Sequence, residues 1–310
     1  MMIWQKTIAR PLSVSGIGLH SGQPVRLHIY PASANQGIRF IRTDLPGRPQ
    51  VRAHHTRVVD TTRATTLGEG PATLSTVEHL LSALWGLGID NVRVEVDGPE
   101  VPIMDGSARP YTEMLAAAGC KTLTWPRSYL LVQQPLEFAH GDAWMRVLPG
   151  QARITYSIDF PHPLIRRQRF SVPLDAETFR EEIAPARTFG FLKEVQYLQS
   201  RGLARGGSLE NALVLDDTDL LNPDGLRFPE EFVRHKILDA VGDLALLGLP
   251  LIGRLEVSRG SHDLHLRFIR HLLEHEEAWQ LWVPPLYNRE LRVAPEPAAL
   301  WGGMPLPSQA

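Results

Sequence analysis

The sequence lacks most of what a secreted or membrane protein carries. It has one cysteine, Cys120, in 310 residues, so an intramolecular disulfide and a zinc cage made of thiolates are both excluded. Its longest apolar stretches, such as 245–253, are far shorter than the roughly 20 residues that a membrane helix needs. The N-terminus lacks the positive-then-apolar order of a signal peptide. These absences predict a cytoplasmic protein without membrane insertion, in which Cys120 is a small buried apolar residue.

An excess of charge of one sign is also missing. The chain has 32 basic and 34 acidic residues, a formal net charge of −2, so no overall basic field indicates a nucleic-acid partner. The length suits two domains, each with its own core. A change of pattern at 124–127 predicts an N-terminal domain over 1–126, a C-terminal domain over 127–281 and a proline-rich tail over 282–310.

Two segments far apart in the chain have the pattern of strong helices. The first spans about Leu74–Leu87, where Ser75 and Glu78 have the spacing of a capping box. The second begins at Pro229, a residue that suits the first helical position. At about 100° per residue, each helix has a histidine opposite its apolar stripe, and a glycine follows that histidine by seven residues.

This correspondence predicts an α+β chain made of two similar halves. Each half would be a two-layer sandwich in which a helix packs its apolar stripe on its own sheet. The helical layers of the two halves would then face each other through the small-residue faces that carry His79 and His235. A polar cleft between the halves is the expected result.

Three side chains in this cleft form a candidate metal site. His235 and Asp239 lie one turn apart on a helical face, and His79 has the matching phase on the other helix. Three protein ligands with one open position are typical of catalytic zinc. Glu78 could take the proton of a water at the metal. Ordinary alternatives stay open: a solvated His–Asp pair, an exposed histidine and, for Glu78, only the capping box.

Three further residues are candidates on weaker patterns. His262 follows a strand and a glycine, and a loop histidine that faced the cleft could protonate a leaving amine. Lys236 could contact a phosphate, and Asp243 could orient a histidine. The alternatives are a structural loop residue for His262 and exposed salt bridges for the other two. The motifs of dinucleotide sites, P-loops, nucleophile elbows and HExxH sites are missing.

Several segments around these residues resemble one protein family, the UDP-3-O-acyl-N-acetylglucosamine deacetylases, which perform the committed step of lipid A biosynthesis in Gram-negative bacteria. The segments are 75–80, 102–107, 186–191 and 232–239. The resemblance runs from Gly16 to about Trp282. It implies a fold of two α+β halves with the active site between their helical layers.

The resemblance also implies a role for each candidate. A zinc ion, with iron as the alternative, would be held by His79, His235 and Asp239, and Glu78 would be the general base. His262 would be the catalytic histidine, oriented by Asp243, and Thr188 would stabilise the oxyanion. Substrate contacts are implied for Lys236, Phe189 and Phe191, and an insert around Phe191–Leu203 would hold the acyl chain. Some members carry a cysteine near the metal where this chain has Ala64, so that extra ligand is missing here.

The expected reaction is hydrolysis of the acetamide of an acylated UDP-sugar, which releases acetate and a free amine. Two rivals stay open: the same metal chemistry on another acylated sugar, and a metal-free protein that binds a lipid or a nucleotide sugar. The presence of a base, an acid and three ligands together argues against the binding protein. A monomer is expected, and the sequence does not specify the preferred acyl length.

Overall fold

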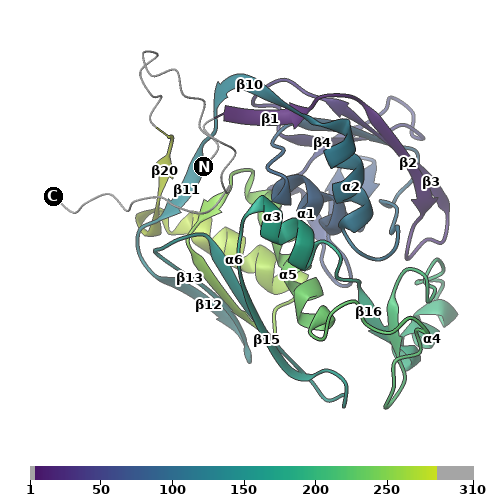
Figure 1. Ribbon diagram of the computed structural model, residues 1–310. Coiled ribbons are helices and arrows are strands. Elements are labelled where there is room, and N and C mark those ends of the chain that lie inside the picture. Colours follow the sequence, from purple (N-terminus) through teal and green to yellow (C-terminus); the bar gives the residue numbers. More distant parts are fainter. Residues whose placement is uncertain (1–3, 285–310) are drawn as a thin grey trace.

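The computed structural model describes residues 4–284. Two five-stranded sheets lie on opposite sides of the molecule, and the main helices lie between them (Figure 1). The first sheet has the order β2-β3-β9-β4-β5 and consists of β2 (Leu12–Ile17), β3 (Pro24–Pro31), β4 (Ile38–Arg42), β5 (Gln50–Arg52) and β9 (Val92–Val96). The second has the order β12-β13-β19-β14-β15 and consists of β12 (Leu136–His140), β13 (Ala143–Leu148), β14 (Arg153–Phe160), β15 (Arg166–Pro173) and β19 (Arg254–Ser258).

The two sheets have the same topology. In each, the strand that comes last in the chain lies in the middle, and its two neighbours run in opposite directions. Thus β9 is antiparallel to β3 and parallel to β4, and β19 is antiparallel to β13 and parallel to β14. The outer pairs are antiparallel in both sheets. This equivalence confirms the prediction of an α+β fold with two similar halves.

Each half has one helix before its central strand and one after it. These helices are α1 (Glu78–Gly86) and α2 (Arg109–Ala118) in the first half, and α5 (Glu231–Leu244) and α6 (His262–Glu274) in the second. Every residue of α1 is buried, because the helix packs both on its own sheet and on α5. A Cβ atom at Gly242 of α5 would lie 2.1 Å from the carbonyl oxygen of Glu78. The helical layers therefore face each other as predicted, and glycine lets them approach closely.

Short strands and turns complete the halves. The first half has the pair β1 (Trp4–Ile8) and β10 (Cys120–Pro126), and the three-stranded sheet β6 (Val58–Asp60), β7 (Thr66–Glu69) and β8 (Ala72–Leu74). The second has the sheet β11 (Tyr129–Val132), β18 (Leu251–Ile252) and β20 (Trp279–Trp282). Short helical turns are η1 (His55–Arg57), α3 (Ala176–Thr178), η2 (Phe179–Ile183), η3 (Ala245–Leu247) and η4 (Glu276–Ala278).

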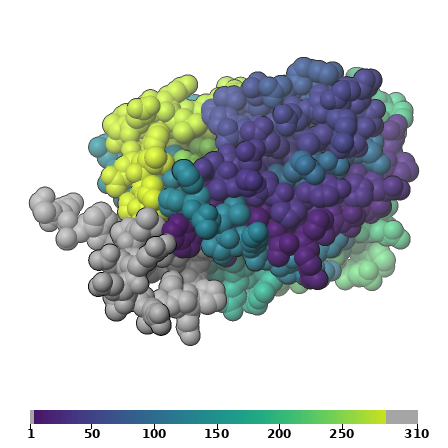
Figure 2. Space-filling model, turned by 90° about the horizontal axis from the view of Figure 1, so that it is seen from above, coloured from purple at the N-terminus to yellow at the C-terminus, as the bar shows by residue number. Residues whose placement is uncertain are grey.

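Among residues 4–284, every strand pairing joins strands on the same side of residue 126. This supports the domains proposed over 1–126 and 127–281, which remain a proposal. Seen from above, the purple and blue first half lies against the yellow end of the second (Figure 2). Trp282, the first residue of the predicted tail, is the last residue of β20. Most of that tail lies outside the described residues. No helix within the described part combines the length and hydropathy needed to cross a membrane.

An insert between β15 and α5 extends from the second half and lies beside the first (Figure 1). It consists of β16 (Phe189–Phe191), α4 (Leu192–Ser200) and β17 (Leu213–Leu215), and β16 pairs with β17 in parallel. The amide groups of Arg205 and Gly206 donate hydrogen bonds to the carbonyl oxygens of His20 and Leu19, at 3.3 and 3.0 Å. These bonds fasten the insert to a loop of the first half.

The capping box predicted at the start of the first helix is wrong. The helix begins at Glu78, because Leu74 ends strand β8 and the Ser75 amide donates to the carbonyl oxygen of Pro99. The carboxylate of Glu78 instead accepts a hydrogen bond from the Thr65 amide, at 3.1 Å. A buried carboxylate that accepts bonds from another segment is not available to cap its own helix.

Two other local predictions are also wrong. His262 lies in the first turn of α6 and not in a loop, and Ser261 caps this helix by accepting a hydrogen bond from the Leu264 amide. Cys120 is exposed at the start of β10, because β1 is the one strand within residues 4–284 that pairs with it, at the surface of the first half. The thiol is therefore not part of the core.

Candidate metal centre

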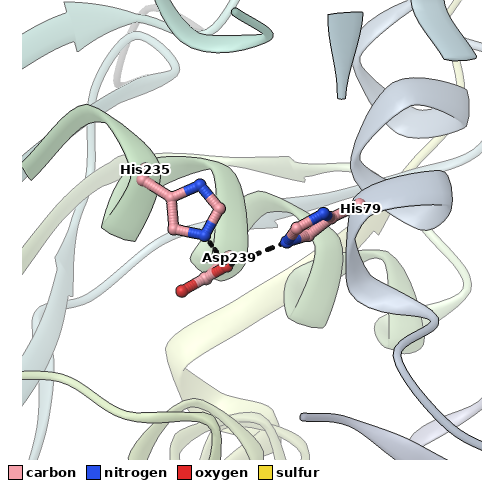
Figure 3. A group of neighbouring side chains, drawn as sticks. All are labelled: His79, His235 and Asp239. Carbon is pink, nitrogen blue, oxygen red and sulfur yellow. Dashed lines mark ion pairs between the residues drawn. The ribbon is translucent and has the colours of Figure 1, made fainter. Parts of the chain in front are cut away.

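The three predicted ligands converge where α1 meets α5. His79 reaches in from α1, and His235 and Asp239 reach from successive turns of α5 (Figure 3). The Nε2 atoms of His79 and His235 lie 3.9 and 3.2 Å from Oδ1 of Asp239. All three side chains are buried, and their ligand atoms lie within 4.8 Å of one another. The predicted juxtaposition of the two helices is therefore present.

This geometry fits one small divalent cation. Tetrahedral ligands at 2.0–2.1 Å from a zinc ion would lie about 3.3 Å apart, and the distances of 3.2 and 3.9 Å to Asp239 bracket this value. His235 Nδ1 lies 3.0 Å from the carbonyl oxygen of Ala186, so Nδ1 carries the proton and Nε2 presents its lone pair to the site. The Nδ1 atom of His79 has no hydrogen-bond partner among the described residues.

The protonation states also suit metal binding, which requires neutral imidazoles and an ionised carboxylate. Burial, together with the nearby His235, lowers the pKa of His79 to about 3. Burial raises the pKa of Asp239, but Lys236 and His235 more than offset this and hold it well below its usual range. The Lys236 ammonium lies 2.8 Å from Asp239 Oδ2, which leaves Oδ1 for the cation. Lys236 thus contacts a ligand and not the surface, while still lining the cavity.

Glu78 lies beside the ligands with its carboxylate on the cavity. Its Oε1 is 3.8 Å from Nε2 of His262 and its Oε2 accepts the Thr65 amide. Burial raises the pKa of Glu78 to about 7, with a lowering contribution from His262 and raising contributions from Asp243 and Asp239. A carboxylate that titrates near neutral pH can accept a proton efficiently.

His262 and Asp243 form a buried pair next to Glu78. The Nδ1 atom of His262 lies 2.7 Å from Oδ2 of Asp243. Burial lowers the pKa of His262, but Asp243 and then Glu78 and Asp239 raise it, to about 9 overall. His262 is therefore a cation at neutral pH and can give up a proton from Nε2, which faces Glu78. This arrangement can combine a base, an acid and a cation within a few ångströms.

A cavity of about 420 Å³ joins these groups. It is lined by the three ligands, by Glu78, Lys236 and His262, and by Thr188, Phe189 and Phe191 from the start of the insert. Asp243 is the one candidate that does not line it, because it lies behind His262. Ala64, the residue that replaces the cysteine of some family members, forms part of the cavity wall.

A second, more apolar cavity of about 640 Å³ continues from the first under the insert. The two share Leu19, Thr188 and Phe189 in their walls. The far part is lined by Leu192, Val195 and Leu198 of α4 and by Leu209, Ala212 and Val214 from the following segment. The polar cleft thus opens into an apolar space on the side of the insert.

Three buried polar residues of this region are not among those predicted from the sequence. Thr65 donates to Asp243 Oδ1 at 2.5 Å, and His265 Nδ1 lies 2.8 Å from Asp243 Oδ2. Tyr156 in turn contacts His265. Thr65 and Tyr156 lie in segments more than 80 residues from Asp243 in the chain, so no local spacing connects them. His265 could have been noticed as a second histidine one turn after His262.

Comparison with known proteins shows which family the chain resembles. Residues 5–274 match the family model described as UDP-3-O-acyl N-acetylglycosamine deacetylase. A protein of Syntrophus aciditrophicus is 47% identical over 90% of this chain and 89% of its own, and one of Anaeromyxobacter dehalogenans is 48% identical over 88% and 89%. One of Geobacter sp. is 45% identical over 94% and 97%. All three are named UDP-3-O-acyl-N-acetylglucosamine deacetylase. With a match over nearly its whole described length and a buried ligand set between two equivalent halves, this chain belongs to the UDP-3-O-acyl N-acetylglycosamine deacetylase family.

Proposed function

We propose that the chain is a zinc-dependent deacetylase that hydrolyses the N-acetyl group of UDP-3-O-(3-hydroxyacyl)-N-acetylglucosamine, the committed step of lipid A biosynthesis. The relatives carry the name of this activity. The observation that carries the proposal is the convergence of His79, His235 and Asp239 with Glu78 and His262 on one cavity. Two imidazoles and one carboxylate suit zinc. Iron(II) also accepts this ligand set and is the alternative.

When bound, the cation supplies Lewis acidity, which polarises a carbonyl oxygen and lowers the pKa of water. Glu78 takes a proton from the attacking water, whose oxygen bonds to the carbonyl carbon of the acetamide. The pKa of Glu78, raised by burial to about 7, suits this role. Thr188 lines the same cavity and would donate its hydroxyl to the oxygen that gains negative charge.

His262 completes the reaction. When the C–N bond breaks, the nitrogen keeps the bonding electron pair and takes a proton from His262 Nε2. Asp243 at 2.7 Å holds the opposite nitrogen and stabilises the imidazolium. The products are acetic acid, which loses its proton to water and leaves as acetate, and the free glucosamine amine. Glu78 then loses its proton and His262 regains one, which restores the starting state.

The apolar cavity supplies the specificity for an acylated substrate. Its lining from α4 and 209–214 can bury an alkyl chain at about 0.8 kcal/mol per methylene. Phe189 lines both cavities and Phe191 lines the polar one, and both would contact the sugar and the start of the chain. Lys236, although paired with Asp239, lines the polar cavity and would face the substrate there.

Acetate release tests this function directly. The purified protein is incubated with the UDP-sugar carrying its 3-O-acyl chain and with the same sugar lacking that chain, each with and without a chelator. We expect release from the acylated substrate, little release without the acyl chain, and none after chelation until zinc is returned. Equal rates on both sugars would favour a different acylated amide as substrate. No release from either sugar by the metal-loaded protein would contradict the proposal.

A further inference from the structure

A second histidine shares the carboxylate that orients His262. His265 lies one turn further along α6 and is fully buried. Its Nδ1 atom lies 2.8 Å from Oδ2 of Asp243, the same oxygen that lies 2.7 Å from Nδ1 of His262. On its other side, Nε2 of His265 lies 3.1 Å from the hydroxyl of Tyr156 on β14. The mechanism described above uses neither His265 nor Tyr156.

The positions of the protons follow from these contacts. An ionised carboxylate only accepts hydrogen bonds. Burial raises the pKa of Asp243, but the neighbouring His262 and His265 more than offset this and hold it well below its usual range. Both histidines must therefore donate from Nδ1. Burial lowers the pKa of His265, so its ring is neutral and its Nε2 accepts the Tyr156 proton. The hydroxyl of Thr65 donates to the remaining oxygen of Asp243, at 2.5 Å.

Asp243, His262 and His265 could also be read as ligands of a second metal ion, since their ligand atoms lie close together. The distances argue against this. The separations of 2.7 and 2.8 Å from Oδ2 to the two Nδ1 atoms are those of charge-assisted hydrogen bonds, whereas ligands of one zinc ion would lie about 3.3 Å apart. Hydrogen bonds account for both ring nitrogens of His265.

Gly260 lies against the contact between Tyr156 and His265. A Cβ atom at this position would lie 2.2 Å from the Tyr156 hydroxyl and 2.9 Å from Nε2 of His265. Its backbone also lines the polar cavity. Because glycine has no side chain, Gly260 leaves room for the contact between the Tyr156 hydroxyl and the His265 imidazole.

We propose that His265, held by Tyr156, is a positioning residue that fixes the Asp243 carboxylate so that His262 keeps its proton on Nδ1 and aims Nε2 at the reacting amide. This deepens the proposed deacetylase function and rests on it. The Asp243 carboxylate accepts hydrogen bonds from Thr65, His262 and His265. Without His265, Oδ2 can rotate away from His262. Loss of such an outer hydrogen-bond partner typically costs 10- to 100-fold in activity.

Matched variants test the role. His265→Leu removes both hydrogen bonds at similar volume, and we expect kcat to fall about 10- to 100-fold while KM and metal content stay unchanged. His265→Asn keeps a donor towards Asp243 and should recover most of the kcat. Tyr156→Phe should lower kcat by a smaller factor. His271→Asn, on the last turn of α6 away from the site, is the control and should behave as the original protein.

Nitrogen NMR of histidine-labelled protein gives a readout that does not depend on activity. In the original protein both rings should show a protonated Nδ1, and His265→Leu should broaden or shift the remaining signal of His262. If His265→Leu does not fold, Tyr156→Phe and His265→Asn are compared in its place. Unchanged kcat and unchanged His262 signals in the folded variants would overturn the proposal. An inactive original protein with the expected spectra would instead count against the deacetylase function and leave the network in place.

Discussion

At the scale of single residues, burial and neighbouring charges together set the pKa values of Glu78 and His262 for opposite tasks. Glu78 and His262 lie 3.8 Å apart, yet the pKa of the carboxyl is raised to about 7 and that of the imidazole to about 9. Burial raises the pKa of Glu78, whereas Asp243 behind the imidazole raises the pKa of His262 against the effect of burial, because its negative charge favours the protonated ring. A base and an acid can therefore coexist in adjacent positions at neutral pH.

The role of Glu78 is testable by a conservative substitution. Glu78→Gln keeps the shape but cannot take a proton, so we expect turnover to fall by about 10²- to 10⁴-fold, the usual contribution of a general base. Metal content should stay the same, because His79, His235 and Asp239 are untouched. Glu113→Gln, an exposed carboxylate on α2, is the control. Turnover of Glu78→Gln within a few-fold of the original would remove Glu78 as the base.

The pH profile of kcat/KM should be bell-shaped. Activity requires ionised Glu78, so it should be lost as pH falls through about 7, or somewhat lower because a bound cation favours the carboxylate. Activity also requires protonated His262, so it should be lost as pH rises through about 9. Both limbs report the coupled pair. His262→Gln should keep low residual activity without the alkaline limb, and an unchanged alkaline limb in that variant would assign it to another group.

At the scale of elements, the site depends on how closely α1 and α5 approach. The two histidine rings lie 5.1 Å apart because the backbone of α5 contacts that of α1 at Gly242. Gly86, the matching residue of α1, lies instead against the ring of Phe179. The two equivalent glycines therefore make room for different neighbours, one a helix backbone and the other a side chain.

Gly242→Ala should separate the helices. Alanine on an open helix surface stabilises by about 1 kcal/mol relative to glycine, but here the methyl group would lie 2.1 Å from the Glu78 carbonyl oxygen. We expect a loss of roughly 1–3 kcal/mol in the free energy of unfolding, as for other overpacked cores, together with weaker metal binding. Denaturant unfolding and a metal titration measure both effects. An increase in stability with unchanged metal affinity would show that this contact does not set the helix spacing.

The sequence predicts these elements unevenly. The two central helices, their matching phases and the repeat of halves follow from periodicity, which is a local property, and the ligands follow from that phase. Local pattern does not predict the start of α1, because it depends on a contact between segments, in which Glu78 accepts the Thr65 amide. The pattern around His262 predicts a loop, whereas Ser261 caps a helix that begins at His262. Tyr156 and Thr65 cannot be predicted from local spacing, since only the folded chain brings them to Asp243 and its histidines.

At the scale of the whole molecule, the chain uses its two halves differently. Both supply a sheet and a central helix, but only the second carries the insert with α4, which is fastened back to the first half at His20 and Leu19. The polar cavity therefore lies between the halves, and the apolar cavity lies between the insert and the loops next to it. A substrate with a polar head and an apolar chain matches this division.

Filling the apolar cavity should change chain-length preference. Leu198 of α4 lines this cavity, so Leu198→Trp should displace the end of a long acyl chain. Losing contact with three methylenes costs about 2.4 kcal/mol, or roughly 60-fold in kcat/KM, and a substrate with a shorter chain should be affected less. Tyr197→Trp changes a residue that is 54% exposed and is the control. An equal effect on long and short chains would place the acyl group elsewhere.

The central claim is that side chains from both halves bind one cation, and the metal stoichiometry of Asp239→Ala tests it most directly. The original protein and this variant are stripped with a chelator, titrated with zinc, and analysed for metal after removal of free ions, with Asp263→Ala on the exposed face of α6 as the control. The account predicts one tightly bound zinc per chain in the original and in the control, and none in Asp239→Ala. A variant that folds and still retains one tightly bound zinc would contradict it.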